Sequence, residues 1–352
     1  MILNKFSLFK NYYKYLNAFQ KKSEYSSEYP PYVGLEVTAI CNLKCNKCPY
    51  GREKVVLPQH SYMDMKLYRK IIDEIKGKVI GVTLSGFGEP FVNPNFFEYV
   101  DYAKRNYLKV SFYSNGTILD DDIIDNIVKY KVDSIGFSID CLPDQYAFYS
   151  HMKNIPLDIA KGHLIAIIRN IEKLLIRIKK SGCHIDIAVI RLDAPESTPL
   201  EEYTSFWKKR GVNVSEVGVL DWGGTVNRVK LTKKRGMEIK CPSPYDLSVF
   251  SSGMVPLCCV DYNATVPLGD ANIQTIKEIY NGKPIRDVRK RIFARDYKGL
   301  PCALCRYDGF GINIENTFVH LLSQIPNIYN SYPLKRIINL LGVIKHKVFL
   351  KS

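Results

Sequence analysis

Residues 36–48 read EVTAICNLKCNKC, a short apolar run that passes directly into three closely spaced cysteines. Cys41, Cys45 and Cys48 are separated by three residues and then by two. Soft thiolate ligands select iron–sulfur clusters, zinc or copper(I). A 4Fe-4S cluster held only by protein takes four cysteines, so a cluster on this loop would keep one iron without a local protein ligand. The motif therefore predicts a catalytic cluster whose open iron binds a substrate or cofactor, and the alternative is a zinc loop or a chance grouping.

The bulk composition is that of a packed protein of more than one domain. The chain has 352 residues, of which 46% are hydrophobic and 12% aromatic, unlike disordered segments. No uninterrupted apolar run of about 18 residues predicts a transmembrane helix, and residues 1–30 lack the apolar core of a secretory signal. We therefore expect a cytoplasmic protein whose cysteines serve metal binding or catalysis rather than disulfides.

The net charge of +15 favours anionic partners. Phosphorylated substrates and an anionic membrane surface both fit, although a lysine-rich composition alone would account for the charge because the basic residues are scattered. We expect no nucleic-acid partner, since the chain leaves no room for such a domain. The basic amphipathic segment 334–350 predicts either peripheral contact with an anionic membrane or a helix packed on the main domain.

Strand-like and helix-like segments alternate along residues 32–224. The expected strands are 33–39, 79–84, 109–113, 134–139, 185–191 and 213–219, and the expected helices are 65–76, 96–105, 121–130, 159–180 and 200–209. Such alternation implies right-handed βαβ crossovers and a parallel sheet. The pattern predicts an α/β fold, either a doubly wound open sheet or a partial barrel.

Each expected strand ends in residues able to carry chemistry. Parallel α/β folds place their sites at the carboxyl ends of the strands, so these residues should share one edge of the sheet. Asn115 followed by glycine is typical of a tight turn. Besides the three cysteines, the candidates at this edge are Gly86, Gly88, Glu89, Ser138, Asp140 and Arg191.

The spacing C-x3-C-x2-C, with these strand ends, resembles the radical S-adenosylmethionine (SAM) superfamily over about residues 34–224. The resemblance implies a partial (β/α)6 TIM-like barrel in which the open iron of a 4Fe-4S cluster chelates SAM. It implies that Gly86, Gly88 and Glu89 contact the methionine amino group. Ser138 and Asp140 would contact the SAM ribose or carboxylate. Arg191 would either reach the same cofactor or form a salt bridge.

One position departs from the family pattern. The residue before the third cysteine is usually aromatic and contacts the adenine, but here it is Lys47. The departure puts that ring contact in doubt and leaves the predicted cluster unaffected.

A second set of cysteines follows where the alternation stops. Cys241 precedes an expected hairpin, 248–250 with 254–257, which ends at Cys258, and Cys302 and Cys305 form a Cys-x2-Cys pair. Four thiolates in this arrangement predict either a tetrahedral zinc or a fully ligated 4Fe-4S cluster. The adjacent Cys259 is an alternative to Cys258.

The second set resembles the SPASM and twitch extensions of radical SAM enzymes. The resemblance implies one auxiliary 4Fe-4S cluster in a small C-terminal α+β domain, because no cysteine follows Cys305. The glycine that precedes Cys258 by five positions, Gly253, favours Cys258 as the ligand. The expected organisation is a leader segment at 1–31, the barrel at 32–224, the auxiliary-cluster domain at 225–310 and a basic tail at 311–352.

These features together predict a radical SAM oxidoreductase. We expect it to abstract hydrogen from a small polar substrate, carbohydrate-like or phosphorylated, and to relay an electron to the auxiliary cluster. A reduced flavodoxin or ferredoxin would supply electrons to the first cluster. The alternatives are a SPASM-type maturase of peptides or proteins and, from another class, a non-catalytic zinc or iron–sulfur binding module.

Overall fold

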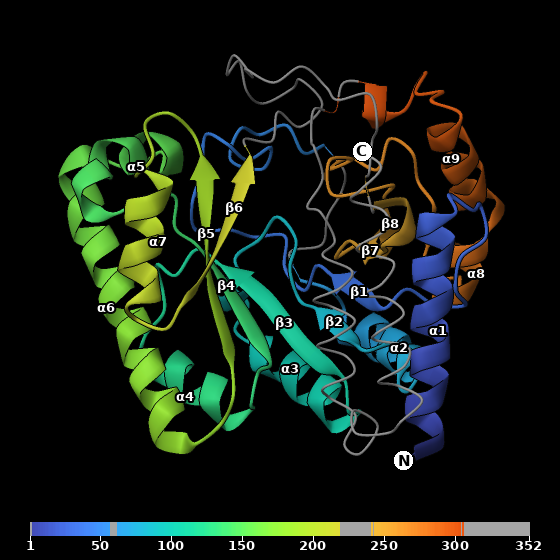
Figure 1. Cartoon of the computed structure of the whole chain (residues 1–352), viewed down its shortest axis with the longest axis horizontal. Coiled ribbons are helices and arrows are strands. Elements are labelled where there is room, and N and C mark those ends of the chain that lie inside the picture. The colour runs from blue at the N-terminus through green and yellow to red at the C-terminus, as the bar shows by residue number, and fades with distance from the viewer. Residues whose placement is uncertain (1, 57–61, 219–240, 242, 304, 306–352) are drawn as a thin grey trace, which may run out of the picture.

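One parallel sheet forms the centre of the molecule (Figure 1). The computed structural model describes residues 2–56, 62–218, 241, 243–303 and 305. Seven strands lie in the order β6-β5-β4-β3-β2-β1-β7, and every neighbouring pair is parallel. The strands are β1 (Tyr32–Leu35), β2 (Gly81–Thr83), β3 (Lys109–Ser114), β4 (Ser134–Ser138), β5 (Asp186–Asp193), β6 (Asn213–Gly218) and β7 (Ser248–Val249). The predicted α/β partial barrel is confirmed.

Helices connect the strands, as parallel pairing requires. Amphipathic spacing stabilises α2, which buries Leu67, Ile71 and Ile75. Capping stabilises α4, where the Asp120 side chain accepts from Ile123 N at 2.8 Å. The helices are α2 (Met65–Ile75), α3 (Phe96–Arg105), α4 (Asp121–Lys129), α5 (Tyr146–Lys153), α6 (Leu157–Ser181) and α7 (Leu200–Lys208). All but α5 match expected helices.

The hairpin predicted at 248–257 is wrong in its pairing. The turn exists, since Phe250 N donates to Met254 O at 2.9 Å, but its two arms join different sheets. β7 pairs with β1 and becomes the seventh strand of the main sheet. The other arm, β8 (Met254–Val255), pairs antiparallel with β9 (Gly269–Asp270). Pairing with an open edge of the large sheet satisfies the backbone groups of β7, and local sequence does not encode that partner.

The auxiliary segment packs on the barrel through one continuous hydrophobic core. Buried residues of the barrel and of α8 (Ile276–Asn281) and α9 (Lys283–Phe293) belong to the same cluster. Helix α2 adds polar contacts: Lys70 Nζ donates to Ala271 O at 2.7 Å, and Glu74 accepts from Ile276 N at 2.8 Å at the start of α8. The parts of the chain before and after residues 219–240 are therefore closely joined.

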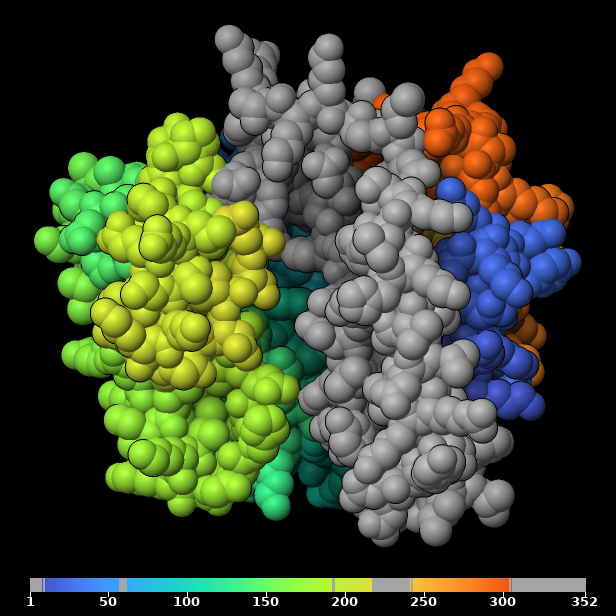
Figure 2. Space-filling model, in the orientation of Figure 1, coloured from blue at the N-terminus to red at the C-terminus, as the bar shows by residue number. Residues whose placement is uncertain are grey.

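The N-terminal segment forms a helix that covers the auxiliary segment. Helix α1 (Ile2–Gln20) packs Tyr12, Tyr15 and Leu16 against Tyr245, and Figure 2 shows it beside the orange residues of α9. The helix lies within the leader segment expected at residues 1–31. No helix in the described residues is long and apolar enough to cross a membrane. The predicted basic amphipathic segment 334–350 lies outside the described residues.

Candidate active site

The three cysteines of the first motif lie in one loop at the carboxyl end of β1. Cys41, Cys45 and Cys48 are all half-buried, and Cys48 N donates to Cys45 O at 3.1 Å across a turn. Leu43 N lies 3.5 Å from the Cys41 sulfur. Three thiols from a single loop, held partly out of solvent, suit the cluster that the sequence predicts.

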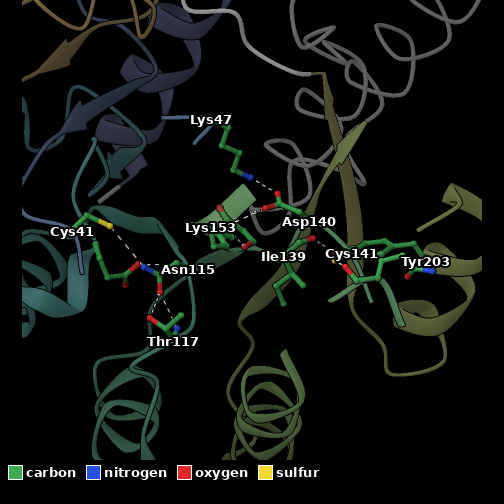
Figure 3. Close-up of polar contacts among 12 residues, drawn as sticks. Cys41, Lys47, Asn115, Thr117, Ile139, Asp140, Cys141, Lys153 and Tyr203 are labelled. Atoms are coloured by element: carbon green, nitrogen blue, oxygen red, sulfur yellow. Dashed lines mark hydrogen bonds and ion pairs between the residues drawn. The ribbon is translucent and has the colours of Figure 1, made fainter. Parts of the chain in front are cut away.

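The cysteine loop is tied to the end of β3 by amide side chains. Asn115 Nδ2 lies 3.9 Å from Cys41 Sγ and donates to Asn42 Oδ1 at 2.9 Å, while Asn42 Nδ2 donates to Thr117 Oγ1 at 2.8 Å. Asn115 Oδ1 accepts from Thr117 N at 2.9 Å. The turn role predicted for Asn115 is confirmed, and its side chain also contacts the loop (Figure 3).

The glycine-rich segment after β2 packs directly on the chain that leads into the cysteines. A Cβ atom on Gly88 would collide with the carbonyl oxygen of Thr38, and one on Gly86 would collide with the side chain of Glu36. Glu36 is itself buried and accepts from Phe87 N at 3.0 Å. The two glycines are required for this close approach. Their predicted contact with SAM stays a prediction.

Glu89 is a buried carboxyl group at the centre of the site. Its two oxygens accept from Ser114 Oγ and from Asn115 N, each at 2.7 Å. Burial raises the pKa of Glu89 to about 7, although these two donors act in the opposite direction. A carboxyl group poised in this way becomes fully ionised when a cation binds beside it, as the predicted contact with the SAM amino group requires.

Asp140 is buried between two lysines that the chain brings from different elements. Lys47 Nζ donates to Asp140 Oδ1, and Lys153 Nζ lies 3.3 Å from Asp140 Oδ2. Lys153 also donates to the Ser138 carbonyl oxygen at 3.2 Å, so both predicted residues at the end of β4 belong to this network. Figure 3 shows the two ammonium groups converging on one carboxylate.

Arg191 is held on the strand side of the site by an ion pair. Its Nη1 lies 2.6 Å from Glu216 Oε2 on the neighbouring strand β6, and its Nε donates to Thr198 O at 2.8 Å. Of the two roles that the sequence left open, the structure shows the salt bridge. A contact between Arg191 and SAM stays a prediction.

The four predicted auxiliary thiols come together around one cavity. Cys241, Cys258, Cys302 and Cys305 all line it. Cys259 lines it as well, so the choice between Cys258 and Cys259 stays open. No group of three His, Cys, Asp or Glu side chains among the described residues is arranged to hold a single metal ion. The rest of the cavity wall is largely apolar, with Pro244, Leu257, Val260, Ile292 and Pro301.

Sequence reasoning missed Lys153 and Asn46 and left Cys141 unassigned. Lys153 ends a helix that hydrophobic periodicity did not predict, and a single lysine carries no local signal of burial. Asn46 gave no signal because its partners are the backbone oxygen of His151 and the backbone of Met152. Cys141 is a core residue whose thiol donates to Gln145 O at 3.3 Å.

Comparison with known families identifies both cysteine sets. The model of the radical SAM superfamily matches residues 35–191, and the model of the SPASM iron–sulfur cluster-binding domain matches residues 241–306. Among curated proteins, the cofactor-modifying protein of the tungsten-containing aldehyde ferredoxin oxidoreductase from Pyrococcus furiosus is 29% identical over 157 residues. That match covers 44% of this chain and 40% of the relative, so the chain spans less than half of that relative's length.

Solved structures share the fold at low sequence identity. SuiB of Streptococcus suis bound to the precursor peptide SuiA has a TM-score of 0.60 and 12% identity, over 80% of this chain and 71% of that one. BtrN in complex with AdoMet and 2-DOIA has a TM-score of 0.50 and 15% identity, over 79% of this chain and 97% of that one. Identities in this range establish the fold alone.

We predict that Gly88→Ala destabilises the protein. The added methyl group would collide with the backbone that leads into the cysteine loop, and such overpacking costs about 1–3 kcal/mol of the free energy of unfolding. Urea denaturation measures the loss. The matched control is Gly162→Ala in the open face of α6, where no heavy atom lies within 4 Å of the new Cβ, and which should stabilise by about 0.5–1 kcal/mol. Equal effects of the two variants would contradict the prediction.

We also predict that Glu89 makes stability fall as pH rises. The folded protein keeps the Glu89 proton up to about pH 7, whereas the unfolded chain releases it near the ordinary value of 4.5. Between these values the unfolded state binds fewer protons, so the free energy of unfolding decreases with increasing pH. From about pH 5 to about pH 8, wild type should lose up to about 3 kcal/mol more than Glu89→Gln. Parallel pH profiles from urea denaturation would refute this.

Proposed function

The chain belongs to the radical SAM superfamily and carries a C-terminal SPASM domain, and on that premise we propose that it oxidises a carbon centre of a small polar substrate. Radical SAM and SPASM domains bind 4Fe-4S clusters and SAM. When bound, the first cluster and SAM supply a 5′-deoxyadenosyl radical able to abstract a hydrogen atom. The protein contributes binding, orientation and exclusion of water.

The residues of the barrel edge have distinct parts in this proposal. Cys41, Cys45 and Cys48 would hold a 4Fe-4S cluster with one protein ligand fewer than its irons, which would leave a place for SAM. Glu89, ionised when the sulfonium cofactor binds, receives the SAM amino group from a position fixed by Ser114 and Asn115. Gly86 and Gly88 let the backbone approach the cofactor. Ser138, Asp140 and Arg191 close the remaining side of the site.

The observation that carries the oxidative role is the second thiol-lined cavity. Four of its cysteines are enough to ligate every iron of a 4Fe-4S cluster, which leaves that cluster no open iron for substrate and suits electron transfer. Oxidation of the substrate removes a hydrogen atom and then a proton and an electron, and a cluster held by these thiols would supply the acceptor for that electron. The solved structure of BtrN with AdoMet and 2-DOIA makes a small polar substrate our first choice. A reduced flavodoxin or ferredoxin in the cytoplasm would start the cycle.

A second candidate is maturation of a peptide or a cofactor. The Pyrococcus relative is named as a cofactor-modifying protein, and the structural neighbour SuiB was solved with a precursor peptide. This candidate uses the same two clusters and differs only in the substrate. An anaerobic assay with both substrate classes, read out as substrate-dependent 5′-deoxyadenosine, separates the two.

We predict that replacing Cys41, Cys45 and Cys48 by Ala abolishes reductive cleavage of SAM. The variant retains the auxiliary thiols but loses the iron that binds SAM, so iron per chain should fall by about half. Chromatography of 5′-deoxyadenosine after dithionite reduction, with iron analysis, measures both quantities. Cys183→Ala is the control, because that half-buried thiol lies at the end of α6. Cleavage retained by the triple variant would refute the assignment of the first site.

Replacing Cys302 and Cys305 by Ala should separate the two reactions. We expect SAM cleavage without substrate to continue, because the first cluster stays intact, while product formation stops for want of an electron acceptor. Product and 5′-deoxyadenosine are measured in the same anaerobic reaction. Unchanged product formation would remove the electron-relay role from the auxiliary site and leave it a structural one.

A further inference from the structure

Three charged side chains, Lys47, Asp140 and Lys153, meet at the cysteine loop, and two of them are almost completely buried. The side chains of Asp140 and Lys153 are 1% and 2% exposed, and that of Lys47 is 21% exposed. The ammonium group of Lys153 lies 3.3 Å from Asp140 Oδ2 and 5.8 Å from the centre of the Tyr149 ring. Charges buried to this degree are rare unless they are paired.

This network lies directly against the loop that holds the first cysteines. Asn46 N donates to Met152 O at 2.9 Å, and Asn46 Nδ2 donates to His151 O at 2.5 Å. The end of α5, where Lys153 is located, therefore contacts the loop between the second and third cysteines. Lys47 in the same loop reaches Asp140, so the network joins the cysteine loop directly to the end of β4.

Asp140 and Lys153 form a buried ion pair. Burial alone would raise the pKa of Asp140, but the attraction of Lys153 and Lys47 outweighs it and holds the pKa below its usual value. The Lys153 ammonium group lies 3.3 Å from Asp140 Oδ2 and donates to the Ser138 carbonyl oxygen at 3.2 Å, so its positive charge faces a paired carboxylate. A fixed cation and a fixed anion are thus present at neutral pH next to the cysteines.

We propose that the Asp140–Lys153 pair sets the reduction potential of the cluster held by Cys41, Cys45 and Cys48. The inference rests on the proposed function, since it needs a cluster on this loop. Reduction adds one negative charge to the cluster, and a buried cation nearby stabilises the reduced form, while a buried anion destabilises it. Little solvent or salt screens charges in such a place. Lys153 thereby makes reduction of the cluster by a physiological donor easier, and Asp140 makes it harder.

Variants that remove opposite charges distinguish an effect on the reduction potential from simple support of the loop. Lys153→Met removes one positive charge, Asp140→Asn removes one negative charge, and the double variant leaves the total as in wild type. If the network merely supported the loop, both single variants would disturb it in the same direction. If its charge sets the potential, the two single variants move the potential in opposite directions. That the two potentials shift in opposite directions does not depend on whether Lys47 carries a proton.

The test is a potentiometric titration of the reconstituted full-length protein without SAM, poised with dithionite and followed by electron paramagnetic resonance. The signal to follow is the one that added SAM alters in a parallel sample. We expect the ratio of reduced to oxidised cluster at a fixed potential to fall about tenfold in Lys153→Met and to rise about tenfold in Asp140→Asn, a shift of about 59 mV each way. The double variant should titrate like wild type.

Lys104→Met is the matched control. Lys104 pairs with Asp133 at 2.6 Å at the opposite, amino-terminal end of β4, so its loss should leave the potential unchanged. Shifts of both single variants in the same direction, or shifts no larger than that of Lys104→Met, would overturn the proposal. If Lys153→Met takes up no cluster, Asp140→Asn decides alone: a rise in the ratio of reduced to oxidised cluster supports the proposal, and a rise no larger than that of Lys104→Met overturns it. A wild-type protein with no SAM-sensitive signal would instead refute the proposed function.

Discussion

Parallel pairing of β1 on both of its sides is the constraint on which the rest of the structure depends. β1 lies between β2 and β7, so it joins the barrel to the auxiliary segment and also leads directly into the cysteine loop. Just beyond its end, Glu36 accepts from Phe87 N on one side at 3.0 Å and from Ser251 N on the other at 3.1 Å. A buried carboxyl group with two backbone donors fixes the segments that follow β2 and β7 relative to β1. The position of the first three thiols follows from this junction.

The site also contains two buried carboxyl groups, those of Glu89 and Asp140, in different electrostatic surroundings. Glu89 is held near its point of titration by burial, whereas Asp140 is kept ionised by two lysines. The two carboxyl groups lie at ends of different strands of the same sheet but differ in their partners, hydroxyl and amide donors for one and ammonium groups for the other. Such a contrast suits an active site in which one group responds to a cationic cofactor and the other maintains a fixed field.

Much of the barrel was predictable because its signals are local. The alternation of apolar strands and amphipathic helices depends on neighbouring residues, and α2 and α4 follow it to within a residue or two. The pairing of 248–249 was not predictable, because two residues of strand carry no information about which edge they join. α5 was also missed, and with it Lys153, since an eight-residue helix with weak amphipathicity gives no periodic signal.

The sequence by itself determined the chemistry of the first cysteine set, since ligand type and spacing are properties of a few adjacent residues, and from ligand type alone it left zinc and a 4Fe-4S cluster open for the second set. It also determined the parallel α/β class, which follows from the order of periodic segments. Only the tertiary structure decided that Asp140 would be enclosed by Lys47 and Lys153, that Arg191 would pair with Glu216, and that five thiols would share one cavity. These contacts join residues far apart in the chain, and their energies come from burial and mutual charge, which exist only once the backbone has brought them together.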